Sequence, residues 1–167
     1  MKSREFHIPT TWRVRGPVAR VFDVLSKPQE FVRWWPEVYL AVRELKAGDA
    51  SGLGRIVDLH TKGWLPYRLN WQAEVVAIDK PRSMSLHARG DLEGHGEWRF
   101  RQEGDWTEAQ YDWTVIVTKP WMVALAPVLE PVFVANHRWA MRRGLEGLER
   151  ELAGGRMIGA EMSGGGA

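Results

Sequence analysis

The sequence contains no cysteine among its 167 residues. This absence excludes disulfides, thiolate zinc sites and a cysteine nucleophile, and it fits the cytoplasmic location that we predict. Long hydrophobic runs are also missing, because the longest, Met122–Pro127, is far too short to cross a bilayer. The first residues lack the apolar core of a signal peptide. We therefore expect no membrane span and no secretory leader.

Charge of one sign is not in excess either. The 23 Lys and Arg residues nearly balance the 21 Asp and Glu residues, and no run of five like charges occurs. Nucleic-acid-binding domains concentrate basic residues on one face or in one run. We therefore predict a mixed, solvated surface and no nucleic-acid partner on a chain of about one domain in length.

Motifs for metal ions, cofactors and common nucleophiles are absent or incomplete. His95-Gly96-Glu97 has the spacing of a zinc deaminase motif, but that chemistry also needs cysteine ligands. Two Gly-x-Gly fragments lack the third glycine and the βαβ unit of a dinucleotide loop. None of the five histidines pairs with another at helical i, i+4 spacing. We therefore predict no metal and no cofactor.

Ten tryptophans are the most informative feature that is present. Several lie in short segments that alternate apolar and polar residues, the pattern of a strand with one buried face. About seven such segments can be recognised, and the turns between them are short, which favours antiparallel neighbours. They are residues 6–15, 38–45, 54–62, 67–78, 84–88, 98–101 and 111–117. The sheet is thus predicted to have an aromatic inner face.

Helical patterns occur in two places. Pro17 and Pro28 each start a short apolar-faced segment, and Pro36 ends the second, so two short helices are predicted between the first and second strands. A long amphipathic helix is predicted over 121–152, with Leu125 and Leu129 on its apolar face and a start near Pro127 or a kink before the next proline. The glycine pair 154–155 is expected to end it. We predict one domain over 1–153 and a flexible Gly-rich tail over 154–167.

One helix is the only large apolar surface available to cover this aromatic sheet. Such a pair often encloses a cavity, and core residues and cavity-lining residues are then partly the same. We therefore predict an α+β fold that binds a hydrophobic small molecule between the sheet and the C-terminal helix. The predicted ligand-binding residues are Trp34, Trp35, Trp71, Trp98, Trp113, Leu129, Phe133, Asn136, His137 and Ala140.

Polar residues near this predicted cavity leave alternatives open. Asn136 and His137 either find partners within the protein or face the cavity, where Asn136 would orient a ligand carbonyl or hydroxyl. Asp58 and His60 share one face of a strand and would form an acid–base pair if that face were inward. The alternation with Val57 and Leu59 favours an outward face, and strand parity places His87 outward as well.

The order of elements and three short segments resemble a known superfamily. Pro17–Leu25 resembles the first helix of the START-like, or SRPBCC, helix-grip proteins, and Phe31–Pro36, with a tryptophan just before a proline, resembles their second. The segment with Asn136-His137, Gly144 and Gly147-Leu148 is similar to helices of bacterial members named polyketide cyclases. The resemblance covers roughly residues 6 to 153. The superfamily also includes the birch pollen allergen.

This resemblance implies a helix-grip fold: a curved seven-stranded antiparallel sheet wrapped on a long C-terminal helix. It also implies a deep apolar cavity whose ligands range from lipids and sterols to polyketides and quinones. Because one fold hosts many functions, three hypotheses remain. The first is binding of a lipid-like or aromatic polyketide-like molecule. The others are a polyketide cyclase or dehydrase, which needs a titratable group in the cavity, and a protein-interaction module with an apolar patch near Trp64 and Leu65.

Overall fold

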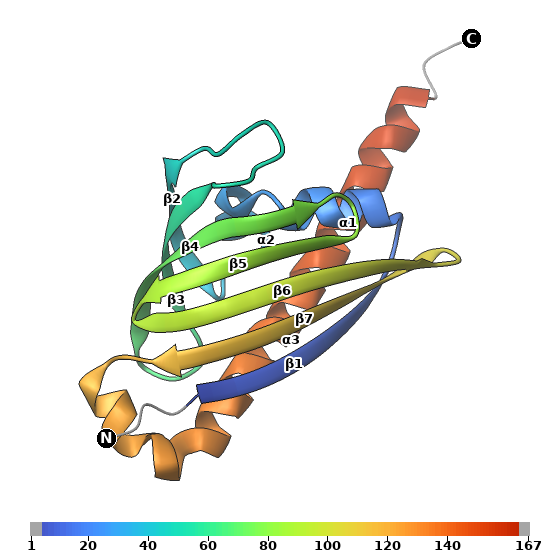
Figure 1. The fold of residues 1–167 in the computed structure, drawn as a ribbon. Coiled ribbons are helices and arrows are strands. Elements are labelled where there is room, and N and C mark those ends of the chain that lie inside the picture. The colour runs from blue at the N-terminus through green and yellow to red at the C-terminus, as the bar shows by residue number, and fades with distance from the viewer. Residues whose placement is uncertain (1–4, 164–167) are drawn as a thin grey trace.

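A computed structural model of the chain describes residues 5–163, and the side chains of residues 5–154. Figure 1 shows a strongly curved sheet whose concave face is crossed by one long helix. In chain order the elements are β1 (Glu5–Arg15), α1 (Val18–Leu25), a single 3-10 turn (Pro28–Glu30), α2 (Phe31–Trp34), β2 (Tyr39–Lys46), β3 (Ile56–Lys62), β4 (Arg68–Asp79), β5 (Ser83–Gly90), β6 (Leu92–Glu103), β7 (Trp106–Val117) and α3 (Pro120–Ser163).

The sheet is open and entirely antiparallel. Its seven strands lie in the order β1-β7-β6-β5-β4-β3-β2, so that the chain's first two strands form its two edges. The helices α1 and α2 lie between these edge strands in the chain and close one end of the concave face. The predicted α+β helix-grip architecture is confirmed.

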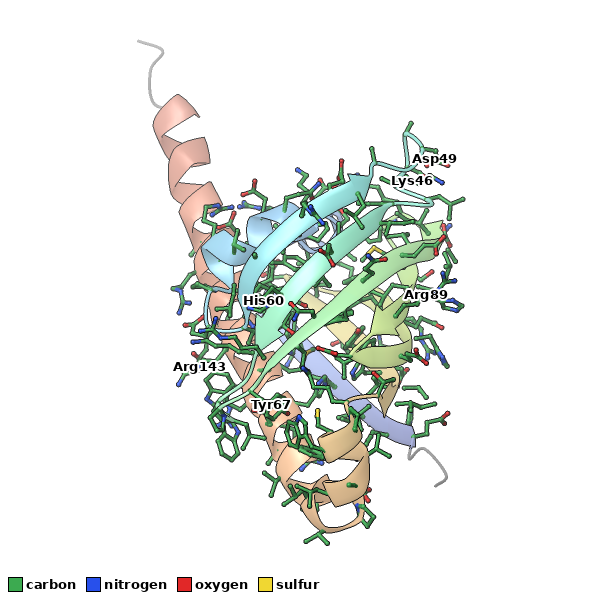
Figure 2. The ribbon with its side chains drawn as sticks, turned by 90° about the vertical axis from the view of Figure 1, so that its left-hand side faces the viewer. Lys46, Asp49, His60, Tyr67, Arg89 and Arg143 are labelled. Atoms are coloured by element: carbon green, nitrogen blue, oxygen red, sulfur yellow. The ribbon has the colours of Figure 1, made fainter. Side chains whose placement is uncertain are left out.

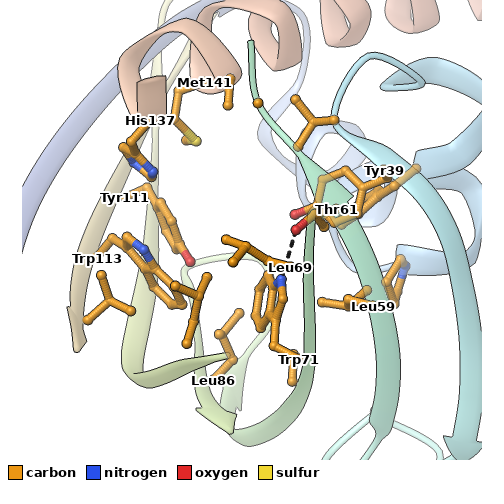
Figure 3. A pocket seen from close by; sticks show the side chains of 18 of the residues that line it. Tyr39, Leu59, Thr61, Leu69, Trp71, Leu86, Tyr111, Trp113, His137 and Met141 are labelled. Atoms are coloured by element: carbon orange, nitrogen blue, oxygen red, sulfur yellow. Dashed lines mark hydrogen bonds between the residues drawn. The ribbon is translucent and has the colours of Figure 1, made fainter. Parts of the chain in front are cut away.

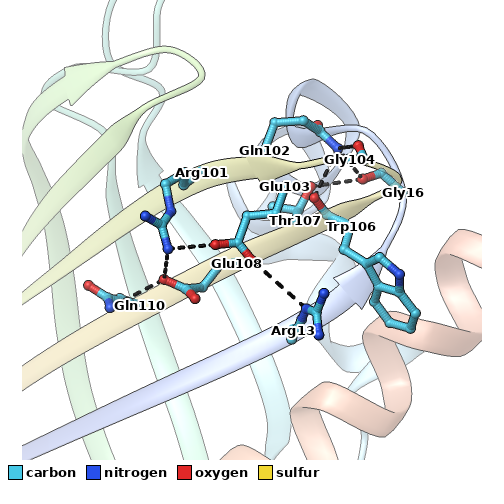
Figure 4. Close-up of polar contacts among 10 residues, drawn as sticks. All are labelled: Arg13, Gly16, Arg101, Gln102, Glu103, Gly104, Trp106, Thr107, Glu108 and Gln110. Carbon is cyan, nitrogen blue, oxygen red and sulfur yellow. Dashed lines mark hydrogen bonds and ion pairs between the residues drawn. The ribbon is translucent and has the colours of Figure 1, made fainter.

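Strict alternation along the strands produces the two faces of the sheet. Along β7, Tyr111, Trp113 and Val115 are buried against the concave side, whereas their neighbours are more exposed. The convex face is polar and carries ion pairs such as Arg13–Glu103 at 3.9 Å (Figure 4). This amphipathic alternation is what a sheet with one solvated face requires.

The end of β6–β7 is tied to the junction between β1 and α1. The Thr107 hydroxyl donates a 2.8 Å hydrogen bond to the carbonyl oxygen of Gly16, and the Gln102 amide donates to the carbonyl oxygens of Gly104 and Trp106 (Figure 4). Thr107 is fully buried. These side-chain bonds join the end of the β6–β7 hairpin to the junction between β1 and α1.

Two glycines let α3 approach α2 closely. A Cβ at Gly144 would overlap the Trp35 ring, and a Cβ at Gly147 would overlap the backbone oxygen of Trp34. The Trp35 indole nitrogen also donates a 3.0 Å hydrogen bond to the Ala140 carbonyl. The position of α2 against α3 is therefore fixed by backbone proximity as well as by a side-chain bond.

The predicted end and apolar face of the long helix need correction. Helix α3 begins at Pro120, one residue before the predicted start at Trp121, so the alternative start near Pro127 is wrong, and both internal prolines lie within the helix. It continues through the glycine pair to Ser163, so the helix end predicted at Gly154 is wrong. Glycine costs about 1 kcal/mol in a helix but does not terminate one. The division into a domain and a flexible tail stays a prediction, and residues 164–167 lie outside the described residues.

The apolar stripe of α3 is displaced from the predicted one near its start. Leu125 is 46% exposed, and the residues buried there are instead Met122 and Ala126, followed by Phe133 and Met141. The first turns of the helix bend relative to the rest (Figure 1), as prolines inside a helix cause. A straight-helix projection therefore assigns the wrong face to these turns.

The close approach at Gly147 predicts a stability effect. We expect Gly147→Ala to lower the free energy of unfolding by about 1–3 kcal/mol, the usual cost of overpacking, because a backbone oxygen cannot move aside like a side chain. Gly154→Ala is the control on the same helix, since an added Cβ there meets nothing within 4 Å. That variant should instead gain up to about 1 kcal/mol from helix propensity. Urea unfolding monitored by circular dichroism measures both, and equal effects would contradict the close packing.

Candidate functional site

A cavity of about 200 Å³ lies between the concave face of the sheet and α3. Its walls come from the inner face of the strands, from the α1–α2 segment and from α3 (Figure 3). Aliphatic and aromatic side chains make most of the surface. The aromatic ones are Phe6, Phe31, Trp35, Tyr39, Tyr67, Trp71, Trp98, Tyr111, Trp113 and Phe133. A concave, mostly apolar cavity with few polar groups is the usual form of a small-molecule site.

Stacked rings on β6 and β7 form the floor of the cavity. Trp98 and Tyr111 face each other across the two strands with ring centroids 4.4 Å apart, and Tyr111 stacks on Trp113 at 5.8 Å. Trp113 continues the row to Trp71 on β4 at 5.7 Å. A Cβ at Gly96 would overlap the Tyr111 ring, so glycine leaves room for it. Each ring is braced by the next, which gives a stiff aromatic surface.

Hydroxyl groups lie within this apolar surface and remain neutral. The Trp71 indole nitrogen donates a 3.0 Å hydrogen bond to the Thr61 hydroxyl, which is buried (Figure 3). Burial raises the pKa of the Tyr39 and Tyr111 phenols well above the usual value. Burial also raises the pKa of Tyr67 to about 12. All three phenols are therefore protonated at neutral pH and can donate a hydrogen bond.

His137 is the titratable group that α3 directs into the cavity. Its ring lies above Tyr111 and points towards the interior (Figure 3). Burial, with a smaller effect from the nearby Arg138 charge, lowers the pKa of His137 to about 4. Its Nε2 atom is buried and has no hydrogen-bond partner among the described residues. The imidazole is thus neutral near pH 7 and leaves one ring nitrogen unsatisfied, which is costly in an apolar site.

Asn136 uses both ends of its amide within the protein. Its Oδ1 atom accepts hydrogen bonds from the backbone nitrogens of Trp64 at 2.9 Å and Leu65 at 3.3 Å. Its Nδ2 atom donates to the Tyr67 hydroxyl at 3.3 Å. Asn136 therefore fastens the β3–β4 loop to α3 at the cavity wall. Of the two alternatives considered for Asn136, the one in which it finds partners within the protein is observed. Ligand binding by Asn136 stays a prediction.

Eight of the ten residues predicted for the site lie on the cavity wall, and two do not. Trp34 is buried beside the cavity, stacked on Trp35 at 5.5 Å. Trp34 is the last residue of α2, whereas Trp35 follows it with non-helical φ and ψ angles of −128° and 48°, and of the two only Trp35 lines the cavity. Leu129 is partly buried against the core but is not on the wall, because the helix bends there. The residues that do line it are Trp35, Trp71, Trp98, Trp113, Phe133, Asn136, His137 and Ala140.

The acid–base pair considered on β3 faces outward. Asp58 forms a 3.3 Å ion pair with Arg43, and His60 is hydrogen-bonded to Asn70. His87 is exposed on β5. Of these groups and His137, only His137 is on the cavity wall. Within the described residues, no cluster of three or more His, Asp or Glu side chains could hold a metal ion.

The sequence reasoning missed several polar residues of the wall. Tyr111 and Thr61 lie two residues from Trp113 and Leu59 respectively, on the same inward faces, so strand parity could have found both. No local signal marks Tyr39, which lies at the start of an edge strand. Two charged residues, Arg55 and Lys62, also border the cavity. The Arg55 guanidinium donates to the Ser26 carbonyl at 2.7 Å.

Comparison with known proteins agrees with this geometry. The family model described as polyketide cyclase/dehydrase and lipid transport matches residues 5–153. Comparison with curated protein sequences finds no match. No helix in the described part of the chain is long and apolar enough to cross a membrane.

Solved structures with the same fold cover nearly the whole chain. The Zhui aromatase/cyclase from Streptomyces sp. R1128 is 18% identical, with a TM-score of 0.72 over 90% of this chain and 94% of that one. A START superfamily protein from Mycobacterium smegmatis is 15% identical, with a TM-score of 0.71 over 88% and 97%. A norcoclaurine synthase mutant from Thalictrum flavum, bound to a transition state analogue, is 14% identical, with a TM-score of 0.65 over 93% and 99%. At these identities the structures show the shared fold, and it is the match of the family model that establishes membership: the chain belongs to the polyketide cyclase/dehydrase and lipid transport family.

Proposed function

We propose that this protein binds one hydrophobic small molecule, lipid-like or aromatic and polyketide-like, in the cavity between the sheet and α3. The observation that carries the proposal is the aromatic-lined cavity of about 200 Å³ in which His137 and Tyr111 are neutral, with the charged Arg55 and Lys62 at its border. Burial of apolar ligand surface there provides about 25 cal/mol per Å². The neutral hydroxyls and imidazole suit a ligand with hydroxyl or carbonyl groups rather than a charged one. A cytoplasmic location stays a prediction.

A catalytic role on a bound polyketide is the second candidate, and His137 is the observation that favours it. A neutral imidazole with an unpaired nitrogen can remove a proton from a carbon beside a ligand carbonyl, so that this carbon attacks a second carbonyl and closes the ring, and can then return the proton to the alkoxide that forms. The Tyr111 hydroxyl lies on the same side of the cavity and can donate a hydrogen bond to a ligand carbonyl. Two of the solved structures that share this fold are named as enzymes, an aromatase/cyclase and a norcoclaurine synthase.

A protein-interaction role has weaker support. It predicts an apolar patch around Trp64 and Leu65 and a cavity that is empty or filled in by side chains. Trp64 is 50% exposed, but Leu65 is partly buried. The cavity is lined by stacked aromatic rings such as Trp98 and Tyr111, which a module used only for its surface does not need.

The ligand-binding proposal can be tested by filling the cavity. We expect Ala140→Leu, on the cavity wall, to weaken binding of the neutral fluorescent probe N-phenyl-1-naphthylamine by about tenfold or more, because the added carbons occupy ligand space. Ala135→Leu is the matched control on the exposed side of the same helix and should bind like the wild type. Mass spectrometry of a solvent extract of both proteins then identifies any co-purified molecule. Equal probe binding by the two variants would refute a site in this cavity.

The catalytic candidate predicts a separation of binding from turnover. We expect His137→Gln to keep probe binding within about threefold and to lose at least about a hundredfold in the rate of ring closure of a linear polyketide thioester analogue, the usual size of a general-base effect. Liquid chromatography with mass spectrometry measures the cyclised product. A His137→Gln protein with full turnover would exclude this residue as the proton acceptor.

The lowered pKa of His137 predicts how stability depends on pH. Between pH 6.5 and about 4 the unfolded chain binds a proton on this side chain that the folded protein does not. The free energy of unfolding should therefore fall as the pH drops through this range, by on the order of 3 kcal/mol from this group. His137→Gln should flatten the curve, and His87→Gln, at an exposed position, is the control for the loss of one histidine. Urea titrations at a series of pH values provide the measurement, and parallel curves for all three proteins would contradict the assignment.

A further inference from the structure

The first turns of α3 expose large apolar side chains instead of burying them. Trp121 is 42% exposed, Leu125 is 46% exposed and Val128 is 77% exposed. Their spacing of four and then three residues places them on one face of the helix. Surface apolar residues scattered singly need no explanation, but a row of this kind marks a surface that contacts something apolar.

The β3–β4 loop adds a fourth exposed apolar side chain beside this row. Trp64, in that loop, is 50% exposed. The loop is fastened to α3 by the Asn136 hydrogen bonds, and the Tyr67 ring contacts the Trp121 ring edge-on at 5.3 Å. Figure 2 shows Tyr67 where the loop meets the bent start of α3. We name Trp64, Trp121, Leu125 and Val128 the apolar rim.

The two segments that carry the apolar rim also form part of the cavity wall. Gly63 and Tyr67 of the loop, and Met122 and Phe133 of α3, face the cavity. The rim is therefore the outer side of the same wall. A surface that covered the rim would be separated from the cavity only by these two segments.

The two segments that carry the apolar rim contain few charged residues and are bordered by basic ones. Residues 120–136 contain a single charged residue, Glu130, and basic residues stand at the borders of both segments. The border residues are Lys62, Arg68, Lys119 and Arg138. Lys119 pairs with Asp91 at 3.3 Å, whereas the other three are exposed and form no salt bridge within the described side chains.

We propose that the apolar rim docks on an anionic lipid surface. Tryptophans at the interface, aliphatic side chains between them and basic residues at the borders are the arrangement of segments that lie in the plane of a membrane. The exposed Lys62, Arg68 and Arg138 complement anionic head groups. The rim lies on the membrane rather than across it, since no helix in the described part of the chain can span one. This proposal does not depend on what the cavity binds.

Sedimentation with lipid vesicles tests the proposal. We expect the wild-type protein to sediment with vesicles of phosphatidylcholine mixed with phosphatidylserine, and to bind pure phosphatidylcholine vesicles much more weakly. The double variant Trp121→Ser/Val128→Ser should bind the mixed vesicles at least about tenfold more weakly, because it loses two inserting side chains. Added salt should weaken wild-type binding.

Matched controls separate docking from loss of fold. Trp106→Ser removes a tryptophan that is 36% exposed at the first residue of β7, at the opposite end of this strand from the start of α3, and should bind vesicles like the wild type. Probe binding in the cavity and the circular dichroism spectrum should be unchanged in both proteins, since none of the three substituted residues is on the cavity wall.

Two results would overturn the proposal. One is equal vesicle binding by the wild-type protein and a folded double variant. The other is a concentration-dependent dimer in the absence of lipid that the double variant abolishes, because the rim would then be the interface with a second copy. Light scattering after size-exclusion chromatography makes this second measurement.

Discussion

The structure depends on the distance at which a single helix is held from a curved aromatic sheet. Protein interiors are normally close-packed, because the side chains around a void lose van der Waals contacts. Here α3 cannot settle further, since glycine contacts fix it against α2 at one end and the Asn136 hydrogen bonds fix it against the β3–β4 loop at the other. The rings beneath are braced on one another, as in the Trp98–Tyr111 stack. The cavity is thus what remains when two stiff surfaces are held apart.

The same constraint controls the chemistry available inside. A group that enters this cavity loses water on nearly all sides, so a charge there is costly and neutral forms are favoured. Burial accordingly keeps His137 unprotonated and Tyr111 protonated near pH 7. Ion pairs lie instead on the convex face, where Arg99 pairs with Asp112 at 2.7 Å in contact with solvent. Two charged side chains, Arg55 and Lys62, reach the border of the cavity, and along strands such as β7 parity places the polar side chains on the outer face.

Periodicity predicted the parts of the fold that depend on simple alternation. The sheet, the two short helices and the inward tryptophans follow from patterns of two and of three to four residues, and eight predicted wall residues are in place. The start of α3 did not follow, because its internal prolines bend the helix and move Leu125 and Leu129 off the inner face. Trp34 and Trp35 could not be separated either, since only the packing of α2 against α3 decides which ring turns inward. The partners of Asn136 depend on a loop about 70 residues away in the chain, which no local pattern reveals.

Two parts of α3 are held in place by different contacts, one with α2 and one with the β3–β4 loop. Towards its C-terminal half, Arg33 of α2 makes hydrogen bonds of 2.6 and 2.7 Å to the Glu151 carboxylate, and the backbones meet at Gly147. Further towards the N-terminal end of the helix, one side chain, Asn136, supplies the hydrogen bonds to the loop, each worth roughly 0.5–1.5 kcal/mol. The Tyr67 ring adds edge-on contacts to Trp121 at 5.3 Å and to Phe133 at 6.4 Å, so the loop is held to α3 by hydrogen bonds and by ring packing together. This junction also carries the exposed side chains of the apolar rim, so the contacts that close one wall of the cavity hold the rim in position as well.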